Sequence, residues 1–168
     1  MEGAEYDFAT LIVERLLAMS SYNNCGEIKE VQIDCDWTST TKDSYNKLCH
    51  CIRYSLNSKG IALSITIRLH QLQETAPPAD RGVLMLYNTG ALKNPDTTNS
   101  ILNINDVEPY IKSKKYTLPL DYAYPTFGWG VKFVNGKFAS IVSEESRPTS
   151  EEERIRHERP TSIEIIDV

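Results

Sequence analysis

Two carboxylates that alternate along one segment are the side chains of this sequence best suited to chemistry. Asp34 and Asp36 belong to Glu30–Trp37, and on one face of a strand they would lie about 7 Å apart. Neighbouring carboxylates push each other's pKa values apart, which prepares one of them to act as an acid or a base. Trp37 adds an aromatic ring that could stack on a sugar. A structural alternative stays open, in which the acids bind loop amides or pair with Arg68.

Other polar and aromatic side chains are weaker candidates. Arg68 shares a strand face with Thr66 and His70, and pairing with Asp36 is favoured over binding a substrate carboxylate because clustered acids need neutralising partners. His70 is expected either to act as a base or to cap a loop. Asp121 is expected near the end of a later strand. An aromatic cluster follows, which either forms a core under a hairpin or faces a ligand: Tyr122, Tyr124, Phe127 and Trp129.

Metal and cofactor chemistry finds little support in the sequence. Among the four cysteines, Cys25, Cys35, Cys49 and Cys51, only the last two are close, and one intervening residue places them on different faces of a helix. We therefore expect buried free thiols and no metal. No glycine-rich phosphate loop follows a predicted strand, and three histidines without a glycine-rich elbow do not suggest a nucleophile triad. No cofactor is expected.

The elements that position these residues alternate between helix and strand. Apolar spacing predicts helices over 5–19 and 42–57, and strict alternation predicts strands over 30–37 and 62–70. Gly60 is expected to end the second helix in a left-handed conformation. Strands separated by crossover helices pair in parallel, so an α/β fold follows. A partial (β/α) TIM-like barrel and an open doubly wound sheet both fit this order.

The second half of the chain predicts shorter elements. An apolar run predicts a buried strand over 83–88, a helix is expected over 105–113 with Asn105 as its cap, and a strand over 116–122. Asn135-Gly136 predicts a hairpin within 127–142. Ser150 and Glu153 occupy capping-box positions and predict a charged helix over 149–158. A last strand is expected over 162–168. The whole chain is expected to form a single domain over 1–168. Its barrel-like part would cover 28–142, and a charged helix and tail would follow over 143–168.

Length and charge restrict the classes of function. A complete (β/α)₈ barrel needs roughly 250 residues, so a barrel built from these 168 residues would be either incomplete or completed by something else. A net charge of −5 disfavours nucleic-acid binding, which relies on basic surface. No apolar run approaches the ~18 residues of a membrane span. The acidic N-terminus is no signal peptide, so we expect an intracellular protein unless a longer chain carries a leader.

Residues 32–37 resemble the fourth-strand motif of family 18 glycoside hydrolases, the chitinase-like barrels. In that motif acids alternate along the strand and end in the glutamate that protonates the leaving group. Asp34 and Asp36 match the last two aspartates, Val31 replaces the first, and Thr38 replaces the glutamate. The resemblance implies that the family's substrate-assisted retaining mechanism lacks its proton donor here.

Two further segments extend the resemblance. Met85–Asn88 resembles the sixth-strand Met-x-Tyr-Asp motif with Asn88 in place of aspartate, and Trp129 matches the aromatic floor of the family. A closer resemblance, over roughly 28–142, is to bacterial proteins of unassigned function, often from gut Bacteroides-type bacteria, which look like chitinase-like barrels. It rests also on Ser64–Arg68, Leu84–Gly90 and Leu118–Asp121. It implies barrel strands four to seven, with strands one to three missing ahead of Met1.

The resemblance implies a glycoside-hydrolase-like protein that binds a carbohydrate and, with a substitute acid, hydrolyses it. Asp36 would be the acid or an electrostatic stabiliser, and Asp34 would hold it. Two alternatives stay open: a non-catalytic carbohydrate-binding protein, favoured by the missing glutamate, and a truncated product without activity, whose open barrel edge would favour self-association. The expected catalytic residues are Asp34, Asp36 and Asp121, and the expected substrate-binding residues are Trp37, Arg68, Tyr87, Asn88 and Trp129.

Overall fold

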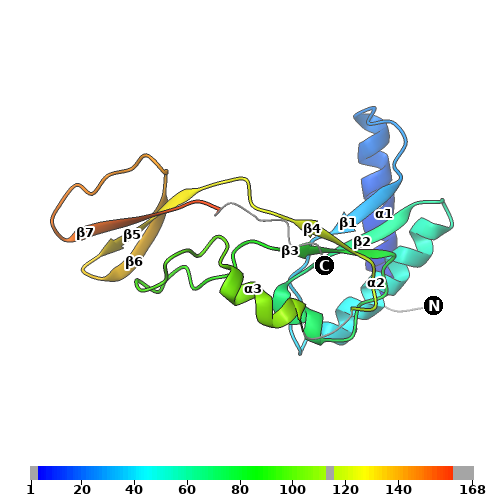
Figure 1. Cartoon of the computed structure of the whole chain (residues 1–168). Helices are drawn as coiled ribbons and strands as arrows, with labels where there is room; N and C mark the ends of the chain where they lie inside the picture. Colours follow the sequence, from blue (N-terminus) through cyan, green and yellow to red (C-terminus); the bar gives the residue numbers. More distant parts are fainter. Residues whose placement is uncertain (1–3, 113–115, 161–168) are drawn as a thin grey trace. The chain divides into compact units, whose positions relative to one another are not determined.

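The computed structural model describes residues 4–112 and 116–160, which fall into two compact units (Figure 1). The first unit comprises Met1–Leu84 and Lys115–Tyr122, and the second comprises Met85–Lys114 and Ala123–Val168. The chain therefore passes from the first unit to the second, returns for one short segment, and leaves again.

Four parallel strands form the sheet that begins in the first unit. They lie side by side in the order β1 (Glu30–Ile33), β2 (Ala62–Ile67), β3 (Arg81–Met85) and β4 (Leu120–Ala123). β1 pairs with β2 in parallel from Glu30↔Ala62 onward, and β2 pairs with β3 from Ser64↔Arg81 onward. The predicted α/β class with mostly parallel strands is confirmed.

Alternation along β2 separates an apolar face from a polar one. Leu63, Ile65 and Ile67 are fully buried on one face. Helix α2 (Lys42–Asn57) contacts this strand and buries its own apolar stripe, which includes Ile52 and Leu56. Burying such side chains is the main source of stability, at about 1.5–3 kcal/mol each.

Both helices predicted in the first unit are present. α1 (Ala4–Tyr22) packs against α2 and buries Ala9 and Val13. After α2, Gly60 has φ +72°, the left-handed conformation that glycine adopts without a steric penalty. The predicted end of α2 is therefore confirmed.

β1 and β2 end earlier than their alternating sequences predict. β1 ends at Ile33 rather than at residue 37, and β2 ends at Ile67 and gives way to a 3₁₀ helix, η1 (Leu69–Gln73). The side chain of Gln71 accepts a hydrogen bond from the backbone N–H of Arg68 at 2.9 Å, and its own N–H bonds the Arg68 carbonyl at 2.9 Å. These local bonds satisfy backbone groups that a longer strand would have paired across the sheet.

The second unit contains the predicted short helix and hairpin. α3 (Ile104–Ile111) is capped by Asn103, whose side chain accepts from the Asn105 N–H at 3.1 Å, so Asn105 was wrongly predicted as the cap. β5 (Trp129–Val134) and β6 (Lys137–Val142) pair antiparallel. Asn135 and Gly136 have φ values of 50° and 75°, as the predicted hairpin turn requires.

The charged helix predicted over 149–158 is wrong, because these residues form a strand. β7 (Glu153–Glu158) pairs antiparallel with β5, from Trp129↔Glu158 to Val134↔Glu153. The other edge of β5 is taken by β6, so β7 completes a three-stranded sheet in the order β6-β5-β7. The strand predicted over 162–168 lies outside the described residues.

No helix in the described part of the chain is both long and apolar enough to cross a membrane.

Candidate functional site

The two aspartates lie where β1 ends, opposite two polar residues of β2 and its continuation. Asp34 Oδ1 accepts a hydrogen bond from Thr66 Oγ1 at 2.8 Å, and Asp36 Oδ1 accepts one from Arg68 Nε at 2.6 Å. Both pairs keep the sequence offset of 32 that relates the paired residues of β1 and β2. The two segments thus keep their register beyond the last backbone hydrogen bond between β1 and β2. The predicted Asp36–Arg68 ion pair is confirmed.

Gln71 fixes the backbone around this pair of contacts. Its side chain is buried, accepts from the backbone of Arg68, and donates to the Trp37 carbonyl at 3.4 Å. One amide therefore links the segment after β1 to the segment after β2. A buried, satisfied amide of this kind holds the charged pair at the carboxyl ends of both strands, the edge at which barrel proteins carry their functional residues.

The ring of Trp37 is covered by protein and does not present a face to a ligand, contrary to the expected stacking role. Trp37 is 5% exposed, its ring stacks on that of Tyr45 with centroids 6.2 Å apart, and Lys42 Nζ lies 5.6 Å from the ring centroid. Burial, with Cys49 beside it, raises the pKa of the Tyr45 hydroxyl. The sequence pattern missed this packing because it depends on the first turn of α2.

Thr38 occupies the position at which the resembling family has its acid. Its hydroxyl lies 2.9 Å from that of Thr40 and 3.3 Å from that of Thr41, and its backbone N–H donates to Thr41 Oγ1 at 2.9 Å. A hydroxyl does not donate a proton to a leaving group as a carboxylic acid does. This group of hydroxyls instead forms the turn that leads into α2.

Asp121 is the second residue of β4, not near its end as predicted. Its carboxylate accepts a hydrogen bond from Arg81 Nη1 at 3.2 Å, and Arg81 Nε also lies 3.8 Å from Glu30 Oε2. Arg81 and Glu30 are the first residues of β3 and β1. Among the described residues, no hydrogen bond or ion pair joins Asp121 to Asp34 or Asp36, so the catalytic role predicted for Asp121 rests on the sequence alone.

The remaining predicted residues belong to the second unit. Tyr87 meets Phe127 edge-on with centroids 6.2 Å apart, and Phe127 lies 5.2 Å from Trp129. Asn88 is exposed and has φ 55°, a left-handed conformation that asparagine tolerates. The structure therefore brings Tyr87 and Trp129 together through Phe127, within a cluster the sequence analysis had singled out.

A buried carboxylate that the sequence analysis missed holds this aromatic cluster. Glu158 accepts hydrogen bonds from Trp129 Nε1 at 3.0 Å, from Ser100 N at 3.0 Å and Oγ at 2.5 Å, and from Arg156 Nε at 2.5 Å. Burial alone would raise the pKa of Glu158, but the hydrogen bonds from Ser100, Trp129 and Arg156 lower it below its usual value. Glu158 is therefore a satisfied anion that positions its neighbours.

Arg156 extends the same network to the loop before α3. Its guanidinium donates to the carbonyls of Asn94 at 2.7 Å and Leu92 at 3.1 Å, and it lies 5.2 Å from the ring centroid of Phe133. The available signal was the spacing of Arg156 and Glu158, because residues two apart lie on one face of a strand and can be buried there as an ion pair. The capping-box positions of Ser150 and Glu153 favoured a charged helix instead.

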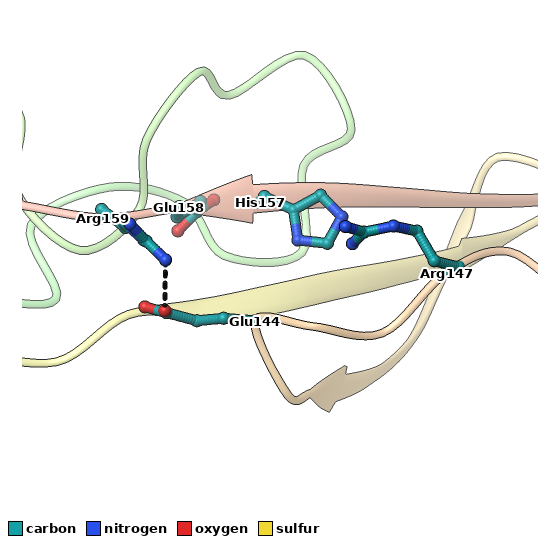
Figure 2. A pocket seen from close by; sticks show the side chains of 5 residues that line it. All are labelled: Glu144, Arg147, His157, Glu158 and Arg159. Carbon is teal, nitrogen blue, oxygen red and sulfur yellow. Dashed lines mark hydrogen bonds and ion pairs between the residues drawn. The ribbon is translucent and has the colours of Figure 1, made fainter.

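A surface hollow of about 530 Å³ borders β7 in the second unit (Figure 2). In it, Arg159 reaches Glu144 Oε2 at 3.0 Å, while Arg147 donates to backbone carbonyls of its own loop. His157 and Glu158 complete the lining. Arg159 and Glu158 are thus ion-paired within the protein, whereas Arg147 has no ion-pair partner among the described residues.

The cysteines belong to no cluster of three or more potential metal ligands within the described residues. Cys49 and Cys51 are buried and Cys25 and Cys35 exposed, all as free thiols. Burial raises the pKa of Cys49 to about 11. No group of three or more potential metal ligands lies together in the described part of the chain.

Taken together, the elements define an α/β protein containing a partial (β/α) TIM-like barrel and a C-terminal β-hairpin. Its fold is similar to the solved structure of a Bacillus subtilis protein described as a sporulation-specific glycosylase, with a TM-score of 0.56 and 15% sequence identity. The similarity covers 82% of this chain but 49% of the other, so the chain spans about half of that protein's length. No family model and no curated protein matches the sequence.

Proposed function

We propose that this chain is a glycan-binding protein of glycoside-hydrolase-like fold, with a binding site at the carboxyl ends of β1 and β2. The observation that carries the proposal is the Asp36–Arg68 pair, with Asp34 and Thr66 beside it. In barrel proteins this edge of the sheet carries the functional residues. The similarity in fold to a protein described as a glycosylase, and the family 18-like motif around the two aspartates, support a carbohydrate as the ligand.

The pair has the polar groups that sugar hydroxyls need. The Asp36 side chain is 61% exposed and that of Arg68 37%, so a ligand can reach both. Asp36 uses Oδ1 to accept from Arg68, and within the described residues Oδ2 has no hydrogen-bond partner. The guanidinium likewise retains NH groups beyond the one at Nε. Together they offer an acceptor and several donors, the pattern by which a vicinal diol is bound.

The aromatic cluster of the second unit is a second candidate surface for a sugar, separate from the Asp36–Arg68 pair. Phe127 and Tyr124 are exposed at 39% and 47%, and Tyr87 and Trp129 are partly exposed beside Phe127. A partly exposed aromatic ring offers an apolar face that can cover the C–H face of a pyranose. Asn88, next to Tyr87, is the candidate for a hydrogen bond to a sugar bound at this cluster.

Hydrolysis is the second candidate function, and the exposed acid at position 36 is the observation in its favour. A general acid contributes typically 10²–10⁴-fold to the rate. The Thr38 hydroxyl cannot act as this general acid, so Asp36 would have to do so, with Asp34 as its neighbour. Asp121 is the other acid proposed from the sequence. Binding without turnover is therefore the favoured outcome.

Calorimetry and a cleavage assay on the same mixtures test both functions. The full chain would be titrated with β-1,4-linked N-acetylglucosamine oligomers and with host-type oligosaccharides, and each mixture analysed for products. Asp36→Asn and Arg68→Gln should each weaken binding about ten- to a hundredfold, since a hydrogen bond to a charged group contributes about 1.5–3 kcal/mol. Glu27→Gln, an exposed acid paired with Lys29, is the matched control and should bind like the wild type.

Each outcome is decisive for one of the functions. Binding lost in both variants without any cleavage would establish the binding protein. Cleavage that Asp36→Asn abolishes would establish the hydrolase instead. A folded wild-type chain that binds none of the sugars, or variants that bind as tightly as the wild type, would contradict the proposed site.

A further inference from the structure

Helix α1 carries apolar side chains on two of its sides. One side, with Ala9 and Val13, is buried against α2. The other is open: Phe8 is 54% exposed, Leu11 61%, Met19 53% and Tyr22 91%. Apolar side chains on two sides are typical of a helix that is covered on both of them.

The exposed side chains form a continuous stripe. Positions 8, 11, 15, 19 and 22 are separated by three or four residues, so they fall on one face of the helix over four turns. Arg15 lies at the centre of the stripe, with two large apolar side chains toward each end. The stripe is therefore symmetric in composition about Arg15.

The area of the stripe is large enough for a specific dimer. Taking about 200 Å² for a full aromatic side chain and somewhat less for Leu and Met, the exposed fractions come to roughly 400–500 Å² in each copy. Two copies would bury roughly 800–1,000 Å² through these four side chains alone, and flanking residues bring the total to the ~1,000 Å² of a small specific interface.

We propose that this stripe is a homodimer interface in which a second copy of the chain lies antiparallel across α1, with the two-fold axis beside Arg15. Symmetry then sets Phe8 against Tyr22 of the other copy and Leu11 against Met19. Such an isologous arrangement uses the same patch twice. It is independent of glycan binding and differs from association through the strand edge, for which the four residues of β1 offer little length.

Charge supports the antiparallel arrangement. Glu14 and Arg15 are both exposed, and neither has an ion-pair partner among the described residues. About a two-fold axis beside Arg15, the arginines of the two copies lie close together, and Glu14, the residue before each of them, supplies the counter-charge, so the centre of the interface holds two positive and two negative charges. The charge at the centre of an otherwise apolar stripe is thereby neutralised, and it fixes the register of the two helices.

Sedimentation equilibrium of the full chain tests the interface. The wild type should dimerise, and Leu11→Glu should weaken dimerisation at least about tenfold, because a charge would be buried at a central contact. Ser21→Glu, which adds the same charge to α1 outside the stripe, should dimerise like the wild type. Circular dichroism would show that both variants keep their helix content, as expected for exposed positions.

A charge swap and cross-linking test the register. Arg15→Glu should weaken the dimer by gathering four acids at the axis, and the double variant Glu14→Arg/Arg15→Glu should restore it. With Cys25 and Cys35 replaced by serine, a mixture of Leu11→Cys and Met19→Cys chains should form the mixed disulfide in preference to either symmetric one. A wild type that remains monomeric, a monomer that binds phospholipid vesicles through α1, or a dimer insensitive to Leu11→Glu would overturn the proposal.

Discussion

Removing Glu158 should destabilise the second unit far more than removing any exposed charge nearby. The Glu158 side chain is fully buried and that of Arg156 nearly so, at 0% and 8% exposure. Glu158→Ala leaves the Arg156 guanidinium buried without its anion, and it removes the acceptor of the Ser100 and Trp129 hydrogen bonds.

The expected cost is about 3–5 kcal/mol, the usual penalty for breaking a buried ion pair by removing one partner. The individual hydrogen bonds to a charged group, at about 1.5–3 kcal/mol each, would sum to more, but they share one carboxylate and are not independent. A loss of this size is a large part of the 5–15 kcal/mol that typically separates a folded domain from its unfolded state.

Urea denaturation measures this loss directly. The chain has two tryptophans, so a Trp37→Phe background makes fluorescence report on Trp129 and hence on the second unit. The matched control is Arg159→Ala, which breaks the exposed Arg159–Glu144 pair one residue beyond the strand and should cost less than about 1 kcal/mol. Equal midpoint shifts for Glu158→Ala and Arg159→Ala would refute the reasoning that Glu158 anchors the sheet.

Acid titration gives an independent test of the same residue. The pKa of Glu158 is lowered in the folded protein. Its stabilising contribution is therefore fully present above the unfolded carboxyl pKa of about 4.3 and is lost as the pH falls through the lower folded value. The unfolding free energy of the wild type should decline in this acid range, and Glu158→Gln should show a shallower decline.

Three further outcomes are expected. Thr38→Glu should add cleavage of chitin-type oligosaccharides, by up to 10²–10⁴-fold over wild type in a fluorogenic assay, and no gain would argue against a family 18-like site. Gly82→Ala should destabilise the chain by about 1–3 kcal/mol in thermal melts, because its Cβ would lie 2.8 Å from Leu120 Cδ2; an unchanged melting temperature would contradict this packing. Hydrogen bonds from Lys132 and Thr149 lower the pKa of Glu153 to about 2. The contribution of Glu153 to the free energy of unfolding, present above about pH 4.3, should therefore disappear as the pH falls toward 2. Glu153→Gln should remove that part of the acid transition measured by circular dichroism.

The sequence predicts α1, α2 and the presence of the parallel strands because the signals for these elements are local. The apolar stripe of α2 and the left-handed glycine at position 60 need no distant partner to be recognised. The Asp36–Arg68 pair was also predictable, since both residues continue alternating strands of a common register.

The errors arise where a distant partner decides the structure. Residues 149–158 have a helical capping pattern, and Glu153 does accept hydrogen bonds from Thr149 at 2.9 Å. The backbone nevertheless forms β7, because the edge of β5 offers a partner to each residue from 153 to 158. Trp37 was expected to face a ligand for a similar reason, since Tyr45, which covers its ring, lies on the following helix.

The return of the chain to the first unit has a consequence for its synthesis on the ribosome. The first unit needs residues 115–122, which are made only after residues 85–114 of the second unit. Because the ribosome adds about 5–20 residues per second, β4 is synthesised a few seconds after β3. During this interval the edge of β3 is open to wrong partners, so slower translation of this stretch should increase aggregation of the nascent chain.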